Sequence, residues 1–185
     1  MAARTEPERL FVALELPEAA RAALAAFRDA ADPAVWRPVG DESLHLTLAF
    51  LGHRPPGTAA AVEAALRGSG AVDAPALALG APLLLPPRRA RVLCAEVEDP
   101  GSGLAALQAQ VSEALVRAGL FEPERRPFRA HATVARLRAG ARAPREPPGE
   151  GPERVAFSGG PLTLFRSHLG RGGARYEPLA RLPLS

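Results

Sequence analysis

The stretch LHLTLAFLGH (Leu44–His53) decides the fold of this chain, because FRAHATVARLR (Phe128–Arg138) repeats its central pattern. Each stretch carries His-x-Thr-x within an apolar run that is typical of a strand. The chain has 4 histidines in all, and His45 and His131 are the two in these matching settings. A matched pair at distant positions favours one shared site over two separate structural roles.

Alternation along a strand determines which side chains of each pattern lie together. Residues two apart point to the same face of a strand. His45 and Thr47 are therefore expected on one face, and His131 and Thr133 on one face of the second strand. If the two strands face one another, two imidazoles flank a single point with two hydroxyl groups beside them.

Such a site suits phosphodiester chemistry without a metal. A neutral imidazole takes a proton from water, and a charged imidazole gives a proton to the departing oxygen. Free imidazole titrates near about 6.5, so both forms are accessible near neutral pH. The hydroxyl groups of Thr47 and Thr133 are candidates to donate to the phosphate oxygens. The two patterns are nearly equivalent, so the residues alone leave open which histidine is the acid.

No metal or cofactor is expected at this site. Zinc takes three or four close ligands, and neither tetrapeptide offers a second His, Cys or carboxylate. Cys94 is the only cysteine, which excludes an internal disulfide and a multi-cysteine zinc site. We interpret Cys94 as a small buried residue of a strand. His53 and His168 are interpreted as loop or strand-end residues.

The residues around the two patterns predict two copies of strand–helix–strand. The first copy covers residues 10–16, 18–32 and 44–51, and the second covers 91–97, 103–118 and 131–137. We therefore expect one domain, residues 1–185, with an internal duplication. The remaining expectations are a connection at 33–40, a strand end at Gly52 and the following residues 54–57, a helix at 59–67, a strand at 75–86, a helix cap at Ser102, and last strands within 153–167 and 174–184.

Composition and charge limit the class of protein. Of the 185 residues, 47% are apolar and 23% charged, which predicts a folded chain. No apolar run reaches the roughly 18 residues of a membrane span, and the polar N-terminus does not resemble a secretory signal. We expect a cytoplasmic protein, by default a monomer. All 23 basic residues are arginine, yet a net charge of +3 only permits an anionic substrate and does not by itself indicate a nucleic-acid binder.

The chain resembles the two-histidine (2H) phosphoesterases, more narrowly the bacterial RNA 2′,3′-cyclic phosphodiesterases, formerly called 2′-5′ RNA ligases. The resemblance rests on RLFVALELP, LHLTLAFLG, RPFRAHATVARLR and RGGARYEPL, which cover nearly the whole chain in order. It implies an α+β fold with two pseudo-symmetric lobes, each an antiparallel sheet with helices on its outer side, and an active-site cleft between them. It also implies hydrolysis of an RNA 2′,3′-cyclic phosphate to a 2′-phosphate. His45 would be the proton donor to the leaving 3′-oxygen, and His131 the acceptor that activates water.

Four arginines and one aromatic residue are candidates for contacts with RNA. Arg136 follows Thr133 by three positions and matches an arginine often found there in the family, which makes it a candidate for either a phosphate contact or a surface role. Phe11 is a candidate to stack on a base, although it also suits core packing. The other candidates, Arg126, Arg171 and Arg175, would line a path for the rest of the RNA, although each also suits a solvated surface charge.

Other functions remain open at the level of the sequence. The same chemistry would serve a small cyclic nucleotide or a 2′-5′-linked oligonucleotide, with cleavage or ligation of the linkage. A different class of protein is an RNA-binding module whose histidines are structural. The expected partner is RNA with a 2′,3′-cyclic phosphate end.

Overall fold

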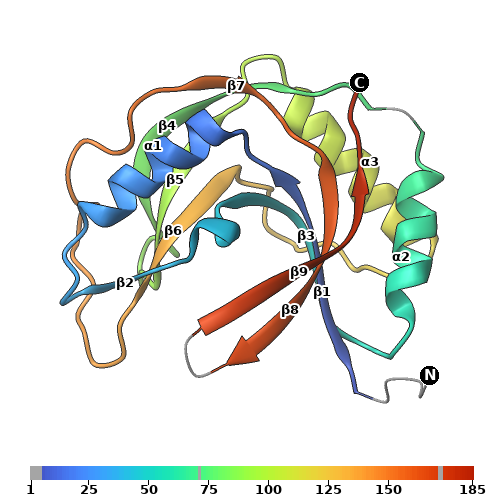
Figure 1. Cartoon of the computed structure of the whole chain (residues 1–185), viewed down its shortest axis with the longest axis horizontal. Helices are drawn as coiled ribbons and strands as arrows, with labels where there is room; N and C mark the ends of the chain where they lie inside the picture. The colour runs from blue at the N-terminus through green and yellow to red at the C-terminus, as the bar shows by residue number, and fades with distance from the viewer. Residues whose placement is uncertain (1–5, 71, 171–172) are drawn as a thin grey trace.

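The computed structural model describes residues 6–70, 72–170 and 173–185. They form an α+β structure in which one antiparallel sheet curls into a half-barrel with helices packed against it (Figure 1). The helices are α1 (Glu18–Asp29), α2 (Thr58–Arg67) and α3 (Gly103–Arg117), with a short 3₁₀ turn at Asp41–Ser43. The strands are β1 (Glu8–Glu15), β2 (Trp36–Pro38), β3 (His45–Arg54), β4 (Ala76–Leu85), β5 (Val92–Glu98), β6 (His131–Leu137), β7 (Ala156–Ser158), β8 (Leu162–Gly170) and β9 (Gly173–Leu182).

The sheet consists of two arms that meet at the motif strands. Its order is β7-β4-β5-β6-β3-β1-β8-β9, and β2 pairs with β6. At the centre, β3 and β6 share a single register pair, Leu46 with Ala132. By contrast, β1 pairs with β3, and β5 with β6, along most of their lengths. This arrangement confirms the expected α+β fold with two antiparallel arms.

Alternation along β1 separates the main core from the opposite face of the sheet. Leu10, Val12 and Leu14 are fully buried in the large core that the helices cover. On the other face, Phe11 and Phe165 belong to a small aromatic cluster of their own.

Two of the helices, α1 and α3, contact the arm opposite to the strand that they follow. α1 follows β1 but contacts β6, whereas α3 follows β5 and contacts β3 as well as β4. α2 packs against α3 and against β1, β8 and β9. None of the described helices has the length and apolar character needed to span a membrane.

Three local expectations are wrong. Residues 33–40 are not only a connection, because Trp36–Pro38 forms β2, whose three residues are too few for a visible alternation. Gly52 does not end the motif strand: it adopts a φ of 72° within β3, which continues to Arg54, where the second part of the expected stop begins. The helix expected to 32 ends at Asp29.

The N-terminus of α3 uses a different residue from the one expected to cap it. Ser102 is the N-cap residue, yet its φ is 57° and its side chain makes no capping hydrogen bond. Instead the backbone N–H of Ala105 donates to Asp99 Oδ2 at 2.9 Å. A carboxylate therefore satisfies one of the free N–H groups of the first turn.

The strand order is mirrored about the centre of the sheet. Outward from the joint it runs β3, β1, β8 on one side and β6, β5, β4 on the other. The internal duplication within one domain, residues 1–185, remains a proposal, and this mirrored order supports it.

Candidate active site

A cleft of about 490 Å³ lies over the joint between the two arms. His45, Thr47, His131 and Thr133 all line it. The register explains why, because Leu46 and Ala132 pair across the joint and are buried on the core side. Their neighbours in each strand then point to the opposite face. The antiparallel sense of the pairing directs His45 towards Thr133 and Thr47 towards His131.

A β-bulge after each threonine adds a second functional position to each motif strand. In β3, Ala13 pairs with Thr47 and Val12 with Ala49, so Leu48 is an extra residue. The bulge shifts the alternation by one, and it returns Phe50, rather than residues 49 or 51, to the cleft face.

The second motif strand has the same irregularity. Cys94 pairs with Thr133 and Leu93 with Ala135, so Val134 is the extra residue of β6. Arg136 is thereby turned to the cleft, which it lines. Phe50 and Arg136 thus occupy corresponding places in the two arms, each three residues after its motif threonine.

His45 packs in a group of aromatic rings. Its ring centroid lies 5.1 Å from that of Phe11 and 5.6 Å from that of Phe165, both in stacked geometry. Phe11 and Phe165 are themselves 5.1 Å apart, and Tyr176 meets His45 edge-on at 5.3 Å. These contacts hold the imidazole ring in one orientation and remove much of it from water.

This environment lowers the pKa of His45 to about 4, mainly because burial penalises the charged ring. The positive charge of Arg136 lowers the pKa further, and the carboxylate of Glu15 raises it. The backbone at Glu42 also favours the charged ring, although Nδ1 makes no hydrogen bond of normal geometry. His45 is therefore neutral in the free protein near pH 7.

His131 is held by its own backbone segment. Its Nδ1 lies 2.8 Å from the carbonyl oxygen of Arg129. A protonated Nδ1 donates to that oxygen, which leaves Nε2 available to the cleft. Beside it, the hydroxyl of Thr133 lies 3.6 Å from the sulfur of Cys94, which is fully buried as expected. Burial raises the pKa of the Cys94 thiol to about 11, so it stays protonated at neutral pH.

The cleft is cationic. Arg9, Arg37 and Arg136 line it, and no Asp or Glu is among the described residues that do so. Such a lining suits an anionic ligand, because the guanidinium group matches phosphate geometry. Arg9, Arg37 and Tyr176 were missed from the sequence. Arg9 carried a usable signal, since it lies two residues before Phe11 and shares its face.

The residues that the sequence suggested for contacts with RNA do not all lie in the cleft. Arg136 lines the cleft. Phe11 belongs to its wall but is only 3% exposed, which leaves little ring surface for a base, and base stacking there stays a prediction. Arg126 is exposed and does not line the cleft. Arg175 pairs with His168, and alternation puts it on the opposite face of β9 from Tyr176. Arg171 lies outside the described residues.

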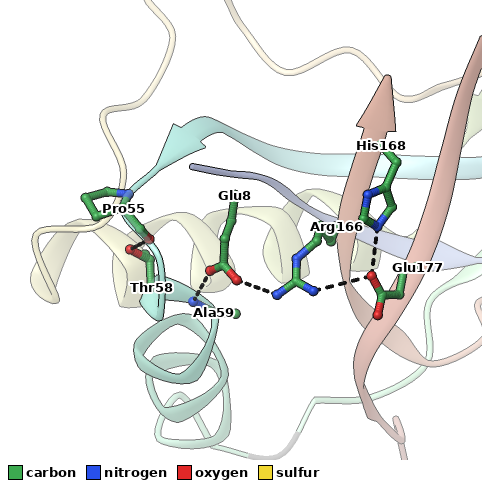
Figure 2. A network of polar contacts seen from close by, with 7 residues as sticks. All are labelled: Glu8, Pro55, Thr58, Ala59, Arg166, His168 and Glu177. Carbon is green, nitrogen blue, oxygen red and sulfur yellow. Dashed lines mark hydrogen bonds and ion pairs between the residues drawn. The ribbon is translucent and has the colours of Figure 1, made fainter. Parts of the chain in front are cut away.

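The other two histidines do not line the cleft. His53 is near the end of β3. His168 is bonded to Glu177 at 2.8 Å (Figure 2), and alternation puts it on the face of the sheet opposite the cleft, the far face. Across the described part of the chain, no three His, Cys, Asp or Glu side chains gather as metal ligands would.

Comparison with known proteins gives a consistent result. Residues 16–148 match the model of the 2′-5′ RNA ligase superfamily. The RNA 2′,3′-cyclic phosphodiesterase of Escherichia coli is 33% identical over 183 residues, 98% of this chain and 99% of that protein. The enzyme of that name from Thermus thermophilus is 37% identical, over 76% of this chain and 73% of its own length.

Solved structures are similar over almost the whole chain. The protein TT0787 of T. thermophilus superposes with a TM-score of 0.81 at 30% identity, covering 95% of this chain and 97% of that one. E. coli LigT complexed with 3′-AMP gives 0.78 at 32% identity, with 97% and 99% covered.

Proposed function

The chain belongs to the 2′-5′ RNA ligase superfamily, and we propose that it hydrolyses the 2′,3′-cyclic phosphodiester at RNA ends to a 2′-phosphomonoester. The names of its relatives support the general activity. The observation that carries the proposal is the single cationic cleft lined by both His-x-Thr pairs. In the proposal, one phosphate binds in this cleft between the two imidazoles.

In the proposed mechanism, His131 is the general base and His45 the general acid. His131 takes a proton from water, and the water oxygen forms a bond to phosphorus. The bond from phosphorus to the 3′-oxygen breaks, and His45 gives its proton to that oxygen. The 2′-oxygen keeps the phosphate. Each such proton transfer typically contributes about 10²–10⁴-fold to the rate.

The contact of His131 with Arg129 supports its role as the base. The Nδ1–H donates to the carbonyl oxygen of Arg129 and directs the lone pair of Nε2 into the cleft. A neutral imidazole in this tautomer is ready to accept a proton from water. Thr47 and Thr133 are proposed to donate hydrogen bonds to the phosphate oxygens, and Arg136 to balance their charge.

In this scheme His45 must become protonated when the substrate binds, because the ring is neutral near pH 7 in the free protein. A phosphate anion in the cleft replaces lost hydration with an opposite charge, and this raises the pKa of His45. The same anion offsets the influence of Arg136, which lowers that pKa in the free protein. Binding would therefore charge the acid at the moment when it is needed.

The test is product analysis with an oligonucleotide that ends in a 2′,3′-cyclic phosphate. The expected product is a 2′-phosphate, formed equally well in excess chelator. His45→Ala and His131→Ala should each lower kcat by about 10²–10⁴-fold while the proteins stay folded. A 3′-phosphate product, loss of turnover on chelation, or full activity in both variants would overturn the proposal. Binding of the RNA without turnover would favour the RNA-binding module, and cleavage of only 2′-5′ linkages the alternative substrate.

A further inference from the structure

We propose that Phe50 and Arg9 form a stacking platform for a nucleobase of the RNA, at the end of the cleft away from the reacting phosphate. The proposal rests on the proposed function, because it assumes an RNA strand in the same cleft. It concerns how that strand is gripped, and not the chemistry at the histidines.

The exposure of Phe50 is the first observation. Its ring is 45% exposed although its neighbours Ala49 and Leu51 in β3 are buried. Single exposed apolar residues are common on proteins, but Phe50 lines the cleft that holds both motif histidines. An aromatic ring kept open to solvent inside a cationic cleft presents the surface on which bases stack.

Arg9 gives the platform a cation. Its guanidinium carbon lies 4.6 Å from the centre of the Phe50 ring, in cation–π geometry. Arg9 Nη1 also donates to Ser167 Oγ at 2.8 Å, which fixes the direction of the long side chain. The flat guanidinium and the ring are thus held together before any ligand binds, which reduces the ordering cost of binding.

The strand beneath Arg9 is anchored from the far face of the sheet. Arg166 neighbours Ser167 in β8 and is bonded to Glu8 of β1 and Glu177 of β9 (Figure 2). These contacts tie β8 to both of its neighbours directly behind the platform. Ser167 is buried, so its hydroxyl is a fixed acceptor for Arg9.

The spacing along β3 suits a strand that leaves the reacting centre. Phe50 follows His45 by five residues, which is roughly 16 Å of extended chain at most. The bulge at Leu48 turns Phe50 to the same face as His45. In the other arm the corresponding bulge turns Arg136 to the cleft. One arm therefore offers a flat ring where the other offers a charge, so the two ends of the cleft suit a base and a phosphate.

The platform predicts little discrimination among bases. Every base has a π-face, and stacking does not depend on the pattern of hydrogen-bond donors and acceptors. Leu169, which is 66% exposed, also lines the cleft and offers apolar surface there without a side-chain hydrogen-bonding group.

The experiment compares Phe50→Leu, which removes the ring and keeps apolar volume, with Phe50→Trp, which enlarges the ring. Three substrates are used: ribose 2′,3′-cyclic phosphate without a base, nucleoside 2′,3′-cyclic phosphates, and dinucleotides with a cyclic end. Val116→Ala is the matched control, because Val116 is 44% exposed and does not line the cleft.

Phe50→Leu should raise KM about 5- to 100-fold on a base-bearing substrate, with no change on the base-free one. Phe50→Trp should keep KM low, and Val116→Ala should leave all three substrates unaffected. An effect on nucleoside cyclic phosphates puts the terminal base on the platform, and an effect only on dinucleotides puts its neighbour there. Both outcomes support the proposal.

An unchanged KM in Phe50→Leu on all base-bearing substrates would overturn the platform. An equal rise of KM on base-bearing and base-free substrates would overturn it too, since it would indicate a structural role for the ring. Both results require an active wild-type enzyme. Failure of the wild type to turn over any of the three substrates counts instead against the proposed function.

Discussion

His45 combines a half-buried aromatic setting with a proposed role that requires charge. Phe11 and Phe165 stack on the ring, and burial lowers its pKa to about 4. Arg136 and Glu15 act on that pKa in opposite directions. We predict that NMR titration of the free protein finds His45 neutral down to about pH 5. A bound phosphodiester analogue, whose own charge is constant in this range, should raise the pKa by a unit or more.

Proton linkage gives this prediction a second readout. If binding raises the pKa of His45, the complex takes up a proton between the free and the bound pKa values. Affinity for the analogue should then increase as pH falls through the bound pKa of His45, and level off below its free pKa of about 4. Glu15→Gln should lower the free pKa further, and Arg136→Gln should raise it. An affinity independent of pH, with the same His45 pKa in both states, would contradict the proton-on-binding scheme.

Glu8 connects three elements on the far face of the sheet. From β1 it accepts a hydrogen bond from the backbone N–H of Ala59, in the first turn of α2, at 3.3 Å (Figure 2). It also forms an ion pair with Arg166 of β8. The N-cap residue of α2 is Gly57, which has no side chain to cap the helix, so the carboxylate of Glu8 supplies the missing acceptor.

Glu8→Gln is therefore predicted to lower the free energy of unfolding by about 1–3 kcal/mol. Glu8 is 6% exposed, and the loss of its charge leaves the half-buried guanidinium of Arg166 with Glu177 as its remaining carboxylate partner. The matched control is Glu18→Gln, because Glu18 pairs with Arg21 in an exposed i,i+3 contact. That change should cost no more than about 0.5 kcal/mol. Equal urea midpoints for the two variants would contradict a structural role for Glu8.

The sequence predicted most elements because their patterns are long. Alternation identified β1, β3 and β6, and apolar residues at helical spacing identified α3 to within one residue of its end. The bulges were not predicted, since one extra residue in a strand leaves no polar mark: Leu48 and Ala49 are both apolar, as are Val134 and Ala135. Without the bulge in β3, simple alternation puts Phe50 on the core face.

At the scale of the molecule, local pattern stops being informative where distant strands meet. Alternation predicted that His45 and Thr47 share a face, and the structure has both lining the cleft. Arg175 shows the limit. It lies one residue from Tyr176, so alternation puts the two on opposite faces, but only the structure shows that the face of Tyr176 is the one that lines the cleft. Arg37 reaches the cleft through β2, whose pairing with β6 has no signature in the sequence.

The charge of the cleft predicts how binding depends on salt. Arg9, Arg37 and Arg136 line it without a carboxylate among the described lining residues, although the whole chain carries only +3. If two or three of these arginines contact phosphates of a single strand, KM should rise roughly 5- to 20-fold between about 50 and 200 mM salt. A cyclic mononucleotide offers one phosphate, so its KM should rise only about two- to threefold.

Arg37→Gln separates local contacts from net charge. With an oligonucleotide as substrate, it should reduce the slope of log KM against log salt concentration by about the amount that one phosphate contact contributes. Arg117→Gln is the matched control: it makes the same change in net charge at the end of α3, outside the cleft. Its salt dependence should match that of the wild type, because charges beyond the Debye length of about 10 Å are largely screened. If the two variants behave alike, net charge governs association, and the arginines of the cleft do not grip the strand.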